Sequence, residues 1–368
     1  MKNPFLLKGY EGTEYFCNRT KETKDLISAL ENGRNITLAS VRRMGKTGLI
    51  QHAFTKIKKV DCVYVDILPA NNLKEFTKIF SNAVVSQLES PLSKSLQRLN
   101  QIFSRLKPSL SFDPVTQQPS IELNIHTQKE SEATLADIFS YLKRRNNRTI
   151  IAIDEFQQIA SYPEKNTEAI LRSHIQHLTT VEFIFSGSQQ HILSNMFYNA
   201  SRPFYQSTQF MFVDRISEMD YSAFIKKHFT ENKKKIEQLQ IDEILYWTKT
   251  HTFYVQSLCN KLFLQTEKAV TTQLLTECMN DILLENEPYF YSYKNLLTAQ
   301  QWNLLRAIAK EDEVSQLNKK EFLTKYQLSA SSVQRSIKAL LEREMVIAEK
   351  NKYRVYDVFL GRWLASKF

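Results

Sequence analysis

The residues that could act on phosphate lie in the segment 40–50, which reads SVRRMGKTGLI. Its Gly45-Lys46-Thr47 ends a phosphate-binding loop of the pattern G-x-x-x-x-G-K-[ST], although Ser40 stands where the first glycine is usual. Glycine lets the backbone approach phosphates without a Cβ in the way, the lysine reaches the β and γ phosphates, and the threonine hydroxyl can bind Mg²⁺. A small serine can still turn the chain at a strand end. We therefore predict a nucleotide site formed by Arg42, Arg43, Met44, Gly45, Lys46, Thr47 and Gly48.

Two further polar sites follow apolar runs that are typical of buried strands. Asp154 and Glu155 follow TIIAI, and Ser186 and Ser188 end the run VEFIFSGS. A carboxylate at the end of a strand beside the loop can hold Mg²⁺ together with Thr47, and the adjacent glutamate can act as the general base for an attacking water. Alone, an Asp-Glu pair is usually a solvated helix start and a serine a turn former. Three such elements in this order, each at a strand end, favour a catalytic nucleotide site that includes Ser188.

The hydrophobic pattern predicts the elements that would position these residues. Apolar alternation and β-forming residues predict strands, and apolar residues at helical spacing predict helices between them. The predicted strands cover 35–39, 61–68, TIIAID, 181–188 and 210–216, and the predicted helices include the one after the loop, 73–88 and 132–145. Strands that alternate with helices predict a parallel, doubly wound α/β sheet. Two alternating runs near 108–126 predict a β-hairpin insertion.

The chain becomes helical after the last predicted strand. The final seventy residues predict a helix, a helix-turn-helix and then a terminal strand pair in IAEKNKYRVYDVFLGRWL, which is the pattern of a winged helix. We therefore predict a core of residues 1–216, a helical lid of 217–297 and a winged-helix domain of 298–368.

Composition agrees with a soluble, multidomain protein. The chain has 368 residues, 42% of them hydrophobic and 24% charged, and a formal net charge of +10, which favours polyanionic partners weakly. Its four cysteines form no C-x-x-C pair, so neither a zinc site nor a disulfide framework is predicted. We find no signal peptide and no membrane span, and we expect a cytoplasmic protein without a membrane partner.

Five motifs together resemble the archaeal-type P-loop ATPases of the STAND and AAA-like group that carry a C-terminal winged helix. They read EYFCNRTKETKDL, SVRRMGKTGLI, IIAIDEFQQI, FIFSGSQQHIL and RPFYQSTQFMFVDRI, and the resemblance extends from about residue 4 to 368. It implies ATP or ADP with Mg²⁺, a sheet of the catalytic-glutamate type with an additional strand, and a helical lid over the nucleotide. By match to the N-terminal motif, it implies that Phe16 and Arg19 lie near the adenine.

The chain departs from the pattern of this group in three places. Ser40 and Val41 replace the usual Gly and Pro, and Gln206 and Ser207 follow RPFY where Gly-Arg is common. Arg202 is then the nearest substitute for a catalytic arginine, with a salt-bridging loop residue as the equal alternative; other candidates are Arg42, Arg43 and Arg215. The lid motif Gly-His-Pro keeps only its histidine, His251.

The second helix of the predicted helix-turn-helix has an apolar side and a polar side. Val333, Ile337, Leu340 and Leu341 are predicted to face the core, which leaves Ser331, Ser332, Gln334, Arg335 and Lys338 outside. Such residues contact phosphates and base edges, and the predicted wing adds Lys350, Lys352 and Arg354. Residues 299–368 hold thirteen Lys or Arg against eight Asp or Glu, a balance of +5. The outer side could bind DNA, or it could contact the ATPase core or another protein.

The leading hypothesis is a slow, Mg²⁺-dependent ATPase that acts as a molecular switch, with Lys46, Glu155, Ser188 and Arg202 as catalytic residues. Two alternatives stay open. One is a module that binds nucleic acid, a protein or a second copy of itself, in which the nucleotide is structural. The other is a small-molecule kinase, which the water-activating Glu155 disfavours.

Overall fold

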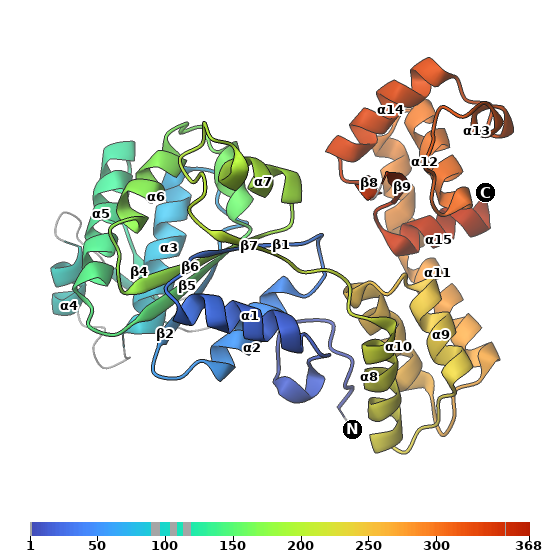
Figure 1. Cartoon of the computed structure of the whole chain (residues 1–368), viewed down its shortest axis with the longest axis horizontal. Helices are drawn as coiled ribbons and strands as arrows, with labels where there is room; N and C mark the ends of the chain where they lie inside the picture. The colour runs from blue at the N-terminus through green and yellow to red at the C-terminus, as the bar shows by residue number, and fades with distance from the viewer. Residues whose placement is uncertain (1, 90–95, 104–108, 113–118, 350) are drawn as a thin grey trace. The chain divides into compact units, whose positions relative to one another are not determined.

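A computed structural model describes residues 2–89, 96–103, 109–112, 119–349 and 351–368 (Figure 1). The chain divides into two compact units. The inserted unit is Gly9–Arg215, and the terminal unit combines Met1–Lys8 with Ile216–Phe368.

A five-stranded sheet forms the centre of the inserted unit. Its strand order is β2-β5-β6-β1-β7, and every neighbouring pair is parallel. The strands are β1 (Ile36–Ala39), β2 (Asp61–Asp66), β5 (Thr149–Asp154), β6 (Val181–Gly187) and β7 (Gln209–Phe212). The parallel sheet predicted from the alternation of strands and helices is confirmed. The strand β6 lies between the strand before the loop and the strand that ends in Asp154, so it is the additional strand of a catalytic-glutamate sheet.

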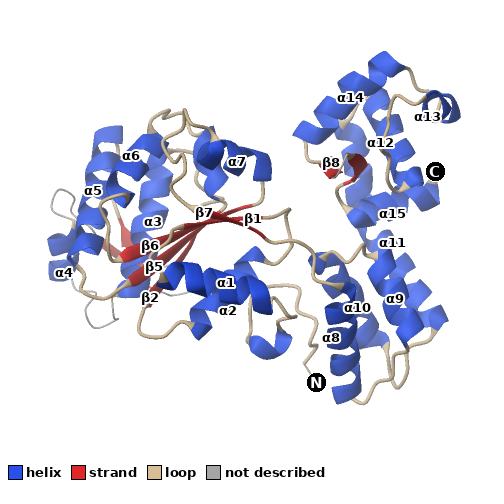
Figure 2. Ribbon diagram, in the orientation of Figure 1, coloured by secondary structure: helices blue, strands red, loops and turns tan. Residues whose placement is uncertain are grey.

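Helices cover both faces of this sheet, as a doubly wound fold requires (Figure 2). Successive strand residues point to opposite faces, so Ile150 and Ala152 of β5 lie in one apolar cluster and Ile151 and Ile153 in the other. The first cluster packs against α1 (Thr20–Glu31) and α2 (Lys46–Lys56). The second packs against α3 (Leu73–Leu88), α5 (Gln128–Arg144), α6 (Thr167–Ile175) and α7 (Gln190–Tyr198).

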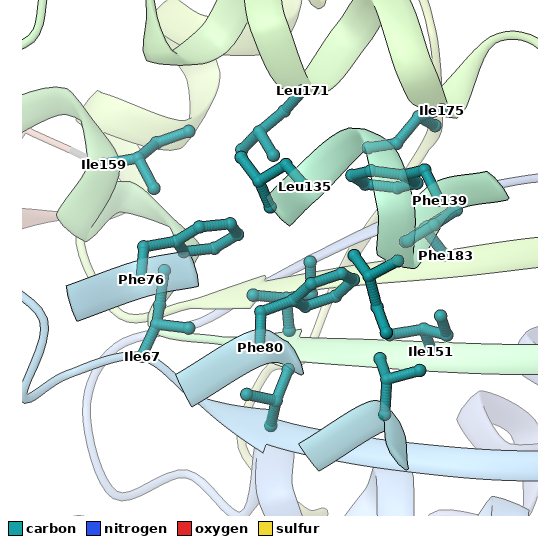
Figure 3. Close-up of a cluster of buried hydrophobic side chains, with 14 of the residues drawn as sticks. Ile67, Phe76, Phe80, Leu135, Phe139, Ile151, Ile159, Leu171, Ile175 and Phe183 are labelled. Carbon is teal, nitrogen blue, oxygen red and sulfur yellow. The ribbon is translucent and has the colours of Figure 1, made fainter. Parts of the chain in front are cut away.

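The second cluster is rich in aromatic side chains. Figure 3 shows Phe76 and Phe80 of α3 in one cluster with Phe139 of α5 and with Ile151 and Phe183 of the sheet. In the same cluster, four more rings contact one another with centroids 4.5–6.0 Å apart: Phe156, Phe185, Phe197 and Phe204. These rings lie directly behind the strand ends of β5 and β6, so they fix the backbone that carries the polar site residues.

Between α3 and α5 the chain forms a short helix and a strand pair. The helix α4 covers Leu96–Ile102, and β3 (Ser109–Phe112) pairs antiparallel with β4 (Pro119–Glu122). The residues that join these two strands lie outside the described residues. The helix α5 begins at Gln128, four residues before the predicted start, because Thr127 and Glu130 form a capping box.

Four helices form the first part of the terminal unit: α8 (Glu218–Glu231), α9 (Gln238–Trp247), α10 (Thr252–Gln265) and α11 (Thr272–Leu296). The N-terminal segment packs among them. Phe5 is fully buried against Phe224, Phe229 and Phe263, and the Asn260 amide donates a 2.6 Å hydrogen bond to the Phe5 carbonyl.

The last part of the terminal unit is a winged-helix arrangement. It consists of α12 (Ala299–Glu311), α13 (Lys320–Lys325), α14 (Ala330–Glu342), the antiparallel pair β8 (Val346–Glu349) and β9 (Lys352–Val355), and α15 (Val358–Lys367). The prediction of a terminal strand pair through the end of the chain is wrong after residue 355. There Asp357 caps a helix, and that helix buries Phe359, Leu360, Trp363 and Leu364. No helix among the described residues has the length and apolarity needed to cross a membrane.

We expect Phe204→Ala to lower the free energy of unfolding of the inserted unit by about 3–5 kcal/mol, because it leaves a cavity among three phenylalanine rings. The Phe204 side chain is 0% exposed, whereas that of Phe212 is 56% exposed. Urea unfolding should therefore show Phe212→Ala within about 1 kcal/mol of the native protein. Equal losses in the two variants would contradict a packing role for Phe204.

Candidate nucleotide-binding and catalytic site

The loop before α2 has the backbone that phosphate binding requires. Arg43 (φ 63°) and Gly45 (φ 89°) both adopt left-handed conformations, and α2 begins immediately afterwards at Lys46. Alternating left-handed residues turn successive N–H groups toward one side of the chain and create a concavity for anions. The helix N-terminus adds a favourable field for negative charge. The predicted strand, loop and helix are therefore confirmed here.

Lys46 lies inside this loop rather than in solvent. Its side chain is 6% exposed, and its Nζ donates a 3.3 Å hydrogen bond to the Ser40 Oγ. The Ser40 hydroxyl in turn donates to the Val41 carbonyl at 2.8 Å. Burial lowers the pKa of the Lys46 ammonium, and Arg42 adds to that shift, whereas the carboxylates of Asp154 and Glu155 oppose it. A phosphate group would supply the anionic partner that this buried cation needs.

The Asp154 carboxylate joins three segments: the start of α2, strand β2 and the end of β5. Its Oδ2 accepts hydrogen bonds from the Thr47 hydroxyl at 2.8 Å and from the Tyr64 hydroxyl at 2.6 Å, and its Oδ1 accepts from the Glu155 N–H at 3.0 Å. Asp66 of β2 is the register partner of Asp154, and its pKa is raised by burial and by both neighbouring acids. Hydroxyl and carboxylate oxygens are the donors that Mg²⁺ prefers, so Thr47 and Asp154 fit that ion.

The Glu155 side chain is held by two donors. Its Oε2 accepts from the Ser188 hydroxyl at 2.8 Å and from the Gln157 amide at 2.5 Å. Its backbone is left-handed, with φ 56°. A non-glycine residue in this region is uncommon, and here it marks the abrupt end of β5.

The N-terminal motif residues lie against the same loop. The Arg19 guanidinium is buried, donates a 3.2 Å hydrogen bond to the Met44 carbonyl, and pairs with Glu22 at 2.7 Å. The Phe16 ring stacks on His52 of α2, with centroids 4.3 Å apart. A Cβ built on Gly48 would lie 3.5 Å from the Phe16 ring. Phe16 and Arg19 are therefore beside the loop, where the resemblance predicted an adenine.

Comparison with known families accounts for most of the chain. Residues 16–258 match the family described as "ATPase domain predominantly from Archaea". The chain belongs to this ATPase family. Residues 288–366 match the family described as "Probable winged helix domain".

Solved structures of archaeal proteins share the fold of this ATPase. The Walker-type ATPase PABY2304 of Pyrococcus abyssi is 17% identical, with a TM-score of 0.67, over 98% of this chain and 99% of that chain. The Aeropyrum pernix ORC2 protein, in ADPNP and ADP complexes, is 14% identical, with a TM-score of 0.64, over 99% of this chain and 96% of that chain. The Aeropyrum pernix ORC1 protein in complex with DNA is 11% identical, with a TM-score of 0.53, over 96% of this chain and 93% of that chain. Among curated proteins, none matches the chain.

Arg202, also predicted to be catalytic, has its ion pair with a residue that is not among the predicted site residues. Its guanidinium forms an ion pair with Glu168 of α6, whose side chain is buried. Burial raises the pKa of the Glu168 carboxyl, and the charge of Arg202 opposes that shift. Among the described residues, its only ion pair is this one, which agrees with the salt-bridging alternative.

Sequence reasoning missed two residues of the site, Tyr64 and Gln157. Tyr64 lies two residues before the end of β2, so it shares a sheet face with Asp66. Burial and the adjacent Asp154 raise the pKa of the Tyr64 hydroxyl, which keeps it a proton donor. Gln157 follows the Asp-Glu pair by two residues. A polar residue so close to a predicted base was a signal that could have been read from the sequence.

The winged helix of the ATPase exposes only some of the predicted nucleic-acid residues. Ser331, Gln334, Arg335 and Lys338 are exposed on α14. Ser332 was predicted outside and is buried, because its hydroxyl donates back to the Ser329 carbonyl at 2.9 Å. Lys352 is exposed but pairs with Glu313 at 2.8 Å, whereas Arg354 is buried and pairs with Glu349. Lys350 lies outside the described residues.

We expect Ser40→Gly to change nucleotide affinity by less than about tenfold, because the lost contact is one long hydrogen bond to Lys46. Calorimetric titration of both proteins with ADP and Mg²⁺ measures this directly. A larger gain in the variant would mean that the missing glycine limits binding.

Proposed function

We propose that the chain is an ATP-binding, Mg²⁺-dependent ATPase that works as a slow molecular switch. One observation carries this proposal. The ends of three strands bring together the side chains of Lys46, Thr47, Asp154, Glu155 and Ser188. A loop for phosphate alone would serve a structural nucleotide. A glutamate held beside the loop by two donors adds the group that hydrolysis requires.

Each residue has a distinct role in the proposed reaction. Lys46 and the loop N–H groups bind the phosphates and neutralise charge as the γ-phosphoryl leaves. Glu155 accepts a proton from the attacking water, and Ser188 fixes the carboxylate that receives it. The loop and Phe16 hold the nucleotide so that its γ-phosphate faces this pair. Slow turnover is expected because a switch must keep its bound ATP long enough for a partner to respond to it.

Mg²⁺ would be held by Thr47 and Asp154. When bound, this ion supplies charge stabilisation for the phosphate oxygens. Tyr64 donates a hydrogen bond to the same carboxylate oxygen as Thr47, so it would orient Asp154 toward the ion.

In this proposal, the winged helix binds DNA in a way that depends on the nucleotide bound to the ATPase domain. Arg335 and Lys338 are exposed on α14, and among the described residues neither forms an ion pair with a carboxylate. The ORC1 structure with DNA, which shares the fold, makes duplex DNA the first ligand to test. The alternative is a protein partner or a second copy on the same helix, with the nucleotide mainly structural.

Glu155→Gln keeps the size of the side chain and removes the base, so we expect normal ATP binding and turnover lower by about 100-fold or more. Phosphate release under saturating ATP and Mg²⁺ is the measurement. Turnover at the native rate would exclude Glu155 as the base.

The matched controls for this experiment separate binding from chemistry. Nucleotide at a hundredfold excess over its dissociation constant should stabilise the native protein by about 2.7 kcal/mol. The melting temperature should rise in native protein and in Glu155→Gln but not in Lys46→Ala. In Asp154→Ala the rise should be smaller and should depend less on Mg²⁺. An equal rise in native protein and Lys46→Ala would refute the site.

If α14 binds DNA, Arg335→Ala combined with Lys338→Ala should lower the slope of log affinity against log salt by about two units, because two fewer phosphates are neutralised. The full chain is titrated with duplex DNA over a range of salt, with Lys352→Ala as the comparison. Because Lys352 already pairs with Glu313, its loss should change the slope less. Binding that ignores salt would favour the protein-docking alternative.

A further inference from the structure

Gln157 occupies a position between the two strand ends that form the catalytic site. It lies in the turn after β5, in the 3-10 helix Phe156–Ser161, and its side chain is 5% exposed. Its Nε2 donates to the Glu155 Oε2 at 2.5 Å, and the Ser188 hydroxyl donates to the same oxygen at 2.8 Å. Both donors therefore act on one oxygen of the carboxylate. For the other oxygen, Oε1, the described residues supply no hydrogen bond.

The neighbouring glycine leaves room for this amide. A Cβ built on Gly187 of β6 would lie 1.9 Å from the Gln157 Oε1 and 2.9 Å from the Leu193 Cδ1. Gly187 has ordinary strand backbone rather than a left-handed conformation, so backbone freedom does not explain why glycine stands there. The space that it leaves is filled by the Gln157 side chain.

The orientation of the amide is set by the carboxylate. The Gln157 Oε1 is buried and has no hydrogen-bond partner among the described residues. A buried acceptor without a donor is unfavourable, so ordinary packing would not select this arrangement. Reversing the amide would bring its carbonyl oxygen against the Glu155 carboxylate, which is worse because both groups are acceptors. The charge-assisted bond to Glu155 is thus the interaction that holds Gln157 here.

We propose that Gln157 is a positioning residue for Glu155, seated by Gly187, and that it acts together with Ser188. The inference rests on the proposed ATPase function. The two donors immobilise Oε2 and direct Oε1 toward the attacking water, whose proton Oε1 accepts. Gln157 itself neither binds the nucleotide nor exchanges a proton.

The test replaces Gln157 with leucine, which keeps the bulk and removes the donor. We expect kcat for ATP to fall by about tenfold, while the KM for ATP and the affinity for ADP with Mg²⁺ stay within about twofold of native. The matched control is Gln158→Leu, the same change at the next residue, whose side chain is only half-buried and has no hydrogen bond to Glu155. That variant should keep the native kcat.

A double-mutant cycle separates positioning from a structural role. In a single-turnover assay, adding Gln157→Leu to Glu155→Gln should lower the rate no further, since the group being positioned is already lost. Gly187→Ala should lower kcat as Gln157→Leu does, because its methyl group displaces the amide.

The outcomes distinguish the inference from the function on which it rests. Native turnover with an unchanged kcat in Gln157→Leu would overturn the inference alone. So would a further loss in the Glu155→Gln background, or a loss of ADP affinity as large as the loss of kcat. A native protein that binds ATP without hydrolysing it would overturn the proposed function and the inference together.

Discussion

The hydrogen bond between Thr47 and Asp154 joins residues 107 positions apart, and the rest of the site is built around it. It forms because β1 and β5 run parallel and end at the same edge of the sheet, with β6 between them. The loop then leads into α2 on one face, while the aromatic cluster fixes β5 and β6 from the other. A change in the order or direction of these strands would separate the phosphate-binding lysine from the carboxylates.

Glycine is scarce in this chain, with seven in 368 residues, and its use shows where backbone geometry matters most. Gly45 is required by a left-handed backbone, whereas Gly187 is required by the amide that lies against it. Ser40 stands at neither kind of position. It is buried, its hydroxyl has a backbone acceptor, and it offers Lys46 a weak partner. The loss of the usual first glycine is therefore compatible with an intact loop.

Much of the fold could be predicted from the sequence because each element carries its own signal. Apolar alternation identified the strands, and the order of strands and helices implied a parallel sheet. The polar residues Lys46, Thr47, Asp154, Glu155 and Ser188 were predictable because each follows a strand whose end must reach the same edge. Contacts such as Tyr64 with Asp154 were not, since they depend on the register between β2 and β5. The final helix α15 was missed because a short apolar run suits a strand or a helix equally well until its Asp357 cap is recognised.

The insertion of one unit within the other bears on how a nucleotide signal could travel. The chain leaves the terminal unit after Lys8 and returns to it at Ile216, so two covalent links join the units. The first link leads through Phe16 and Arg19, and Arg19 binds the loop carbonyl of Met44. The second follows β7, where the Val213 N–H bonds the Ala39 carbonyl directly before Ser40. A phosphate that draws Lys46 away from Ser40 would act on a segment tied to both links. The two links are therefore each hydrogen-bonded to the loop segment, one directly before Ser40 and the other at Met44.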